Sequence, residues 1–183
     1  MMKISDDFDL FLLEASFLQG IVPQLEKHPL FNADDIKKLG NGVSLDEIEK
    51  KLQEEAAMPV FVQGDRLVGC IQRAHEEDAN LVPEVLVENL ATRASGALAL
   101  RLLFGKGLAA DEVDYLIGCG EEAVGDRYNR GGGNMAKAMG ELCGCSRATG
   151  SDVKAFCCGP LHAMVQASGL VVSHIFDNVI VVG

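Results

Sequence analysis

The sequence predicts an α/β protein with a mainly parallel sheet. Short apolar segments of strand length recur at 113–119, 152–158 and 177–183. Segments with helical spacing of apolar residues, at about 134–143 and 158–173, separate them. Strands that are joined through helices form crossovers, and crossovers build a parallel sheet with helices on both of its faces.

The first 57 residues are acidic and predict helices. They contain 12 acidic and 6 basic side chains. Ser44, followed by Glu47, has the spacing of a capping box at the start of the last helix. Helices are expected at about 6–18, 32–39 and 44–57. We therefore expect a helical appendage at 1–57, packed outside an α/β domain at 58–183.

Strand patterns begin after this appendage. Residues 59–73 predict a β-hairpin with Gly64 and Asp65 in its turn. Pro83 then begins a long helix that ends near the glycines at 105–107. The last apolar strand, 177–183, reaches the end of the sequence, so we expect the chain to be part of a longer protein.

Composition and charge exclude several functions. The net charge is −11, whereas nucleic-acid binding requires clustered Lys and Arg. No apolar run approaches the roughly 18–20 residues that a membrane helix needs, and the polar start is unlike a signal peptide. Six cysteines without such a signal predict reduced thiols in a cytoplasmic protein.

Cys157 is the candidate nucleophile. The strand at 152–158 delivers it to the start of the next helix, where Gly159 permits a tight turn and Pro160 suits the first helical turn. Unpaired N–H groups and the helix dipole favour a thiolate there, which could carry an acyl group. Alternatively, Cys157 and Cys158 are small core residues. In a strand the two would face opposite ways, so Cys158 is expected to pack against the sheet.

The segment 125–134 is a candidate anion site. Backbone N–H groups beside arginines could hold phosphate or a carboxylate. Alternatively, the glycines only permit a close crossing of the backbone, and the acidic residues only form caps or ion pairs. The pattern matches no P-loop or dinucleotide fingerprint. The candidate residues are Glu121, Glu122, Arg127, Arg130, Gly131, Gly132, Gly133 and Asn134.

We expect no metal and no cofactor in this chain. The Cys143-Gly144-Cys145 spacing is not Cys-x-x-Cys, and no second pair follows it. His162 lies five residues after Cys157, about 500° around a helix, so it does not stack over the thiol. A packed or capping role is expected for this histidine.

Several segments resemble one family along nearly the whole chain. Cys157-Cys158-Gly159, followed by Ala163 and Met164, resembles the nucleophile region of thiolases and condensing enzymes. More specifically, the chain resembles the larger, thiolase-like subunit of component C of glycine/sarcosine/betaine reductase complexes. The segments that carry this resemblance are MKISDDFDLFLLE, LVGCIQRAH, PEVLVENLATRASGALAL, GCGEEAVGDRYNRGGGNMAKAMGELCG and ATGSDVKAFCCGP.

This resemblance implies the N-terminal half of a thiolase-like fold that acts in acyl transfer. In such complexes, component C receives a carboxymethyl group from the selenocysteine of component A. It forms an enzyme-bound acetyl thioester, and phosphate cleaves the thioester to acetyl phosphate. The family's nucleophile position falls on Cys157, while Cys158 stands where alanine is expected. The C-terminal half, with its activating histidine, is absent from this sequence.

The implied partners are the smaller subunit of component C, the selenoprotein component A and a second copy of the chain. Two other hypotheses stay open at this point. The chain could be a truncated or non-catalytic scaffolding subunit, or an anion- or nucleotide-binding module that uses the glycine-rich segment. The sequence does not distinguish glycine, sarcosine or betaine as the ultimate substrate.

Overall fold

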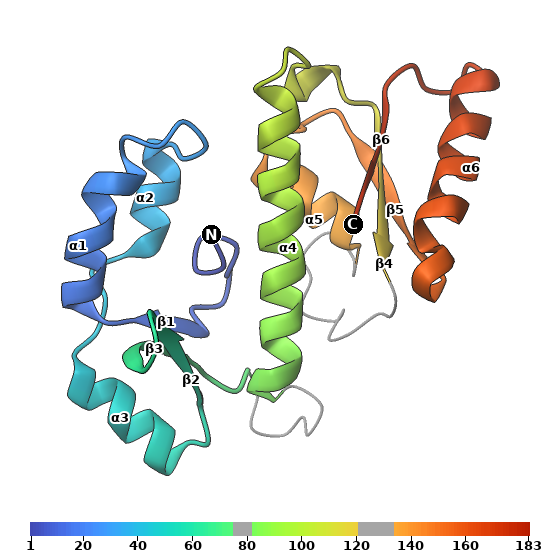
Figure 1. The fold of residues 1–183 in the computed structure, drawn as a ribbon. Helices are drawn as coiled ribbons and strands as arrows, with labels where there is room; N and C mark the ends of the chain where they lie inside the picture. The colour runs from blue at the N-terminus through green and yellow to red at the C-terminus, as the bar shows by residue number, and fades with distance from the viewer. Residues whose placement is uncertain (75–81, 121–133) are drawn as a thin grey trace. The chain divides into compact units, whose positions relative to one another are not determined.

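The structure is a computed structural model that describes residues 1–74, 82–120 and 134–183 (Figure 1). It divides into two compact units, Met1–Ala91 and Thr92–Gly183. Each unit contains one three-stranded sheet with helices. The long helix α4, Pro83–Phe104, contains the boundary between the units.

The sheet of the first unit is antiparallel. Its strands are β1 (Phe11–Leu13), β2 (Met58–Val62) and β3 (Arg66–Ile71), in the order β1-β3-β2. The predicted hairpin is therefore present as β2 and β3. Strand β3 is central, and the residues from Val68 to Ile71 are buried.

Three helices accompany this sheet: α1 (Ala15–Leu25), α2 (Ala33–Leu39) and α3 (Leu45–Glu54). Polar side chains cap each of them. The Ser44 hydroxyl accepts a hydrogen bond from the Glu47 backbone N–H at the start of α3. Helix α3 packs against β3 and buries Ile48 completely. Acceptors at a helix start satisfy N–H groups that have no partner within the helix.

Two features of this unit differ from the sequence prediction. Residues 11–13, expected within a helix at 6–18, form β1 and pair with β3. Phe11 and Leu13 are buried and Leu12 is half-buried, but all three residues are apolar. The sequence therefore shows no alternation of polar and apolar residues, and the apolar run suits a helix equally well. Because β1 pairs with the hairpin, residues 1–57 and 58–73 share one sheet. The division of the chain falls after Ala91, not after residue 57 as expected.

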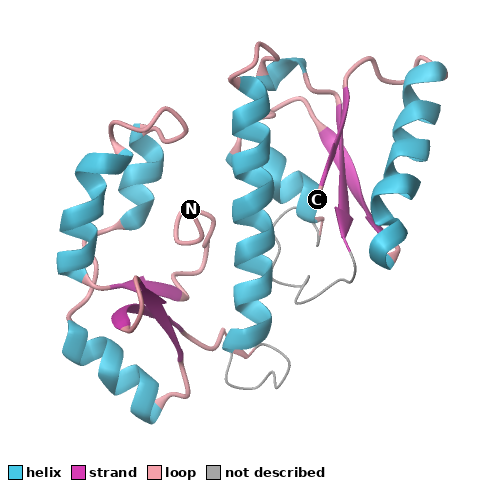
Figure 2. Ribbon diagram, in the orientation of Figure 1, coloured by secondary structure: helices cyan, strands magenta, loops and turns pink. Residues whose placement is uncertain are grey.

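The sheet of the second unit is parallel. Its strands are β4 (Tyr115–Gly120), β5 (Thr149–Lys154) and β6 (Val179–Val182), in the order β5-β4-β6. Helix α5 (Met135–Leu142) precedes β5 in the chain, and helix α6 (Gly159–Val172) precedes β6 (Figure 2). These are the strands and helices that the sequence predicts for this part of the chain.

Helices cover both faces of the parallel sheet (Figure 1). On one face, α5 and the end of α4 pack against the strands through Leu100, Leu116 and Met139. On the other face, Ala163 of α6 packs against Ile117 and Val153. The crossover from β4 to β5 and the crossover from β5 to β6 run in opposite directions across the sheet. Crossovers of one handedness therefore place their helices on opposite faces.

The α/β fold class is thus confirmed, and it is consistent with part of a thiolase-like domain. The predicted single mixed sheet is instead two small sheets, one antiparallel and one parallel. Within the described ranges, no helix combines the length and the apolar character that crossing a membrane would require.

Candidate active site at the carboxyl edge of the parallel sheet

The carboxyl ends of β4 and β5 form the candidate site. These two strands are neighbours in parallel register, with Gly120 beside Lys154 at their ends. After β4 the chain continues to α5 on one face, and after β5 it continues to α6 on the other. Open α/β sheets bind ligands in the region just beyond the carboxyl ends of their strands.

A sharp strand-to-helix junction follows β5. Phe156 has a φ of 47°, in the left-handed region that residues with a Cβ rarely adopt. A short 3-10 helix, Phe156–Cys158, leads from there directly into α6. Gly159 lies against the end of β4: a Cβ on it would be 3.2 Å from the Gly120 carbonyl oxygen. The junction is therefore tight and strained, a feature that is common at functional sites.

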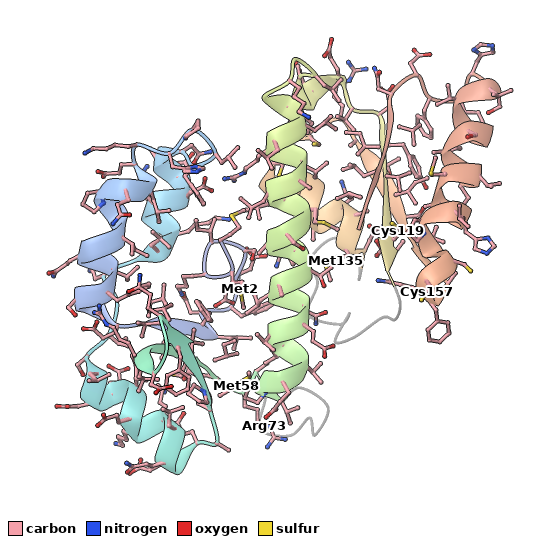
Figure 3. The ribbon with its side chains drawn as sticks, viewed as in Figure 1. Met2, Met58, Arg73, Cys119, Met135 and Cys157 are labelled. Atoms are coloured by element: carbon pink, nitrogen blue, oxygen red, sulfur yellow. The ribbon has the colours of Figure 1, made fainter. Side chains whose placement is uncertain are left out.

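This junction exposes Cys157 at the carboxyl edge (Figure 3). The predicted strand-to-helix junction is present, since β5 ends at Lys154 and α6 begins at Gly159. The strand is shorter than predicted, and the two cysteines lie between it and the helix. Cys158 is the N-cap residue of α6, and Pro160 lies in its first turn. An exposed thiol beside the first turn of a helix can attack an external electrophile.

The expected environment of Cys158 is wrong. It was predicted to pack against the sheet because neighbouring strand residues face opposite ways. Both cysteines instead belong to the 3-10 helix, and both are exposed. Successive residues of a 3-10 helix are about 120° apart, so they need not face opposite sides of the sheet. Exposure alone therefore does not distinguish Cys157 from Cys158.

The other cysteines have more enclosed environments. Burial raises the pKa of the Cys145 thiol to about 11, and it also raises the pKa of Cys70. Cys119 lies near the end of β4 and is half-buried (Figure 3). Burial raises its pKa, while the positive charge of Lys154 acts in the opposite direction. These thiols are disfavoured as nucleophiles because the thiolate is the reactive form.

Asp152 and Asn134 organise the start of α5. The Asp152 carboxylate accepts hydrogen bonds from the backbone N–H groups of Met135, at 2.6 Å, and Ala136, at 2.9 Å. The Asn134 side chain accepts one from the Lys137 N–H and donates one to the Gly150 carbonyl. The first N–H groups of α5 are thus bound by protein groups. This helix start does not offer them to phosphate, in contrast to a P-loop.

Asn134 is the one residue of the predicted anion site that lies in the described part of the chain. Both polar ends of its amide are engaged in the bonds just described. The other predicted residues lie outside the described residues: Glu121, Glu122, Arg127, Arg130, Gly131, Gly132 and Gly133.

Two further sequence expectations concern metals and His162. Among the described residues, no three His, Cys, Asp or Glu side chains are grouped so that they could hold a metal ion. His162 lies on α6 and is exposed, so it is not packed in the core, and the capping alternative stays a prediction. Sequence reasoning missed Asp152 and Lys154, since a carboxylate and a lysine at the end of a strand match no motif.

A pocket lies at the opposite, amino edge of the same sheet. Its volume is about 360 Å³. Lys137, Glu141, Cys145 and Ser146 line it, together with small residues. It therefore lies apart from the strand ends that carry Cys157, and no residue of the predicted site belongs to it.

The fold and the junction define a class of protein: a parallel α/β domain that presents a cysteine at the carboxyl edge of its sheet, directly before a helix. The chain is 47% identical over 182 residues to the glycine/sarcosine/betaine reductase complex component C subunit beta of Peptoclostridium acidaminophilum.

The alignment covers 99% of this chain but 35% of that relative. The chain thus spans about a third of the length of the relative it matches. No protein-family model matches the sequence. The comparison bears out the resemblance to a component C subunit, and the relative carries the designation beta. The larger-subunit and thiolase-like assignments stay predictions.

Proposed function

We propose that this chain is part of a component C subunit of a glycine/sarcosine/betaine reductase complex, and that Cys157 carries an acetyl group as a thioester. The single observation that supports this role best is the strained junction that exposes Cys157 at the end of β5. The 47% identity to a component C beta subunit supports the assignment to such a complex.

The proposed reaction of the thioester is transfer to phosphate. A phosphate oxygen attacks the thioester carbonyl, a carbon–oxygen bond forms and the carbon–sulfur bond breaks. Acetyl phosphate then leaves, and the thiolate of Cys157 is regenerated. Cys157 immediately precedes Cys158, the N-cap residue of α6, so it lies at the positive end of that helix dipole. A positive dipole end stabilises an anionic sulfur.

The proposed donor is a carboxymethyl group on the selenocysteine of component A. Its conversion to an acetyl thioester replaces a carbon–selenium bond by a carbon–hydrogen bond. A thiol of the donor protein supplies the two electrons as a selenium–sulfur bond forms, and the carboxyl oxygen leaves as water. This chain needs no cofactor of its own in that scheme. A smaller component C subunit completes the set of proposed partners.

The reverse of the phosphate step tests this function directly. Acetyl phosphate is incubated with the chain in its complex, and the cysteine peptides are analysed by mass spectrometry. We expect acetylation at Cys157 that is released by added phosphate and by hydroxylamine. If the chain is a scaffold only, the thiols stay unmodified while another subunit becomes acetylated, and the proposal fails.

A further inference from the structure

Lys154 lies at the carboxyl end of β5, three residues before the candidate nucleophile. It is the last residue of β5 and pairs in register with Gly120, the last residue of β4. Its ammonium nitrogen is 3.5 Å from the position that a Cβ on Gly120 would occupy. Glycine at this position therefore leaves open space beside the ammonium group, at the carboxyl edge of the sheet.

The start of α6 lies against the same glycine. A Cβ on Gly159 would be 3.2 Å from the Gly120 carbonyl oxygen and 3.4 Å from its nitrogen. Cys157 and Cys158 immediately precede Gly159. Gly120 thus has the Lys154 ammonium group on one side and the cysteine-bearing junction on another. The influence of Lys154 on the neighbouring Cys119 thiol agrees with a positive charge at this edge.

Two other positive groups among the described residues of this unit are engaged at the amino edge of the sheet. Arg147 pairs with Asp114 at 3.9 Å, and Lys137 donates a hydrogen bond to the Ala148 carbonyl at 3.4 Å. By contrast, no carboxylate among the described residues forms a salt bridge with Lys154. The chain as a whole carries a net charge of −11 and repels small anions. A positive side chain at the site would therefore attract an anion that the chain as a whole repels.

We propose that Lys154 attracts and positions the oxyanion of the substrate beside Cys157. This inference rests on the proposed function, in which both reactants are anions: a carboxymethyl donor with a carboxylate, and phosphate. A lysine ammonium acts as a compact point charge with three rotatable donors, so it suits either oxyanion. Lys154 is a positioning group here, because the thiol and not the amine forms the covalent bond.

The test compares two alkylating reagents of different charge. Iodoacetate is an anion that delivers a carboxymethyl group to sulfur, whereas iodoacetamide is neutral. Both react with the same thiolate, so the ratio of their rates cancels any change in thiolate fraction. The ratio is measured at Cys157 in the full chain with Cys158→Ala, at low salt. It is compared with the same ratio for the free thiol N-acetylcysteine.

We expect the iodoacetate to iodoacetamide ratio at Cys157 to exceed that of N-acetylcysteine and to fall with added salt. Lys154→Gln should lower the ratio roughly two- to fivefold, the size of one partly screened charge interaction at a few ångströms. Lys154→Arg should retain it. The matched control is Lys137→Gln, which removes a lysine at the opposite edge and should leave the ratio unchanged.

Inorganic phosphate distinguishes the two sources of the oxyanion. If phosphate binds at Lys154, it slows iodoacetate more than chloride of equal ionic strength does, and Lys154→Gln abolishes the difference. If Lys154 serves the donor carboxylate instead, phosphate has no such effect while the drop in the ratio persists. A ratio that is the same in Lys154→Gln and in the parent overturns the inference. Acetylation of Cys157 by acetyl phosphate is measured in a separate experiment. An unchanged ratio in Lys154→Gln therefore overturns this inference without contradicting the proposed function.

Discussion

At the scale of single residues, the thiols of this chain divide by environment. Cys157 and Cys158 are exposed at one strand-to-helix junction, whereas Cys70 and Cys145 are buried. Burial disfavours the charged thiolate and raises the pKa of a buried thiol. The same side chain therefore serves as a small apolar core group in one place and is accessible for chemistry in another.

Cys145 provides a prediction with a definite sign. Its pKa is about 11 in the folded protein, against an ordinary value of 9.0. Between these values the unfolded state loses the proton first, so the free energy of unfolding should fall as the pH rises from about 9 to 11. The loss is on the order of 2 kcal/mol. Urea denaturation at several pH values should show a shallower decline for Cys145→Ala. Equal slopes for the variant and the parent would contradict the burial of this thiol.

At the scale of elements, most helices and strands were predictable, because their apolar spacing and caps are local signals. The Ser44 cap, the helix that begins at Pro83 and the strand that became β5 are examples. β1 was not predictable, since its three residues become a strand only by pairing with β3, far along the chain. The exposure of Cys158 was also not predictable. The backbone turns at Phe156, which has a positive φ, and no glycine at that position signals such a turn in the sequence.

Asp152 should stabilise the connection between β5 and α5. Its carboxylate accepts two backbone hydrogen bonds at the start of α5. Asp152→Ala should therefore lower the free energy of unfolding by about 1–2 kcal/mol, the usual cost of a lost helix cap. Thermal or urea denaturation measures the change. Asp111→Ala, at an exposed site on the same unit, is the control and should change stability little. Equal effects of the two substitutions would refute the capping role.

Tight packing beside Asp152 explains a second element-scale feature. A Cβ on Gly118 would collide with the Asp152 carboxylate and lie 3.3 Å from the Cβ of Ala136 in α5. Glycine on β4 thus permits the carboxylate to reach the helix start. The candidate site depends on this packing, because the ends of β4 and β5 carry Gly120 and the cysteine junction. The sequence showed these glycines, but only the register of the strands shows which contacts they permit.

At the scale of the whole chain, α6 has an exposed apolar face. One side of the helix packs against the sheet through Ala163. The opposite side exposes large apolar side chains, and Phe156 before the helix is 64% exposed. Single exposed apolar residues are ordinary, but a contiguous patch of this kind marks an interaction surface. The exposed apolar residues of α6 are Leu161, Met164, Val165, Val171 and Val172.

We therefore expect the isolated chain to associate with a second copy through α6. Leu161, Val165 and Val172 lie at intervals of four and seven residues, on one face of the helix. Replacing all three by glutamine should shift the chain to a monomer. Light scattering at micromolar concentration measures the mass. A parent chain that is strictly monomeric would count against this surface.

The most direct test of the account is which cysteine holds the acyl group. In the complete complex, acyl loading from the carboxymethyl donor is measured by mass spectrometry of the peptide that contains both thiols. The account predicts that Cys157→Ser abolishes loading, whereas Cys158→Ala leaves it largely intact. Loading that is lost in Cys158→Ala but kept in Cys157→Ser would contradict it. Loading that survives both substitutions would place the thioester on another subunit, and would equally contradict the role of Cys157.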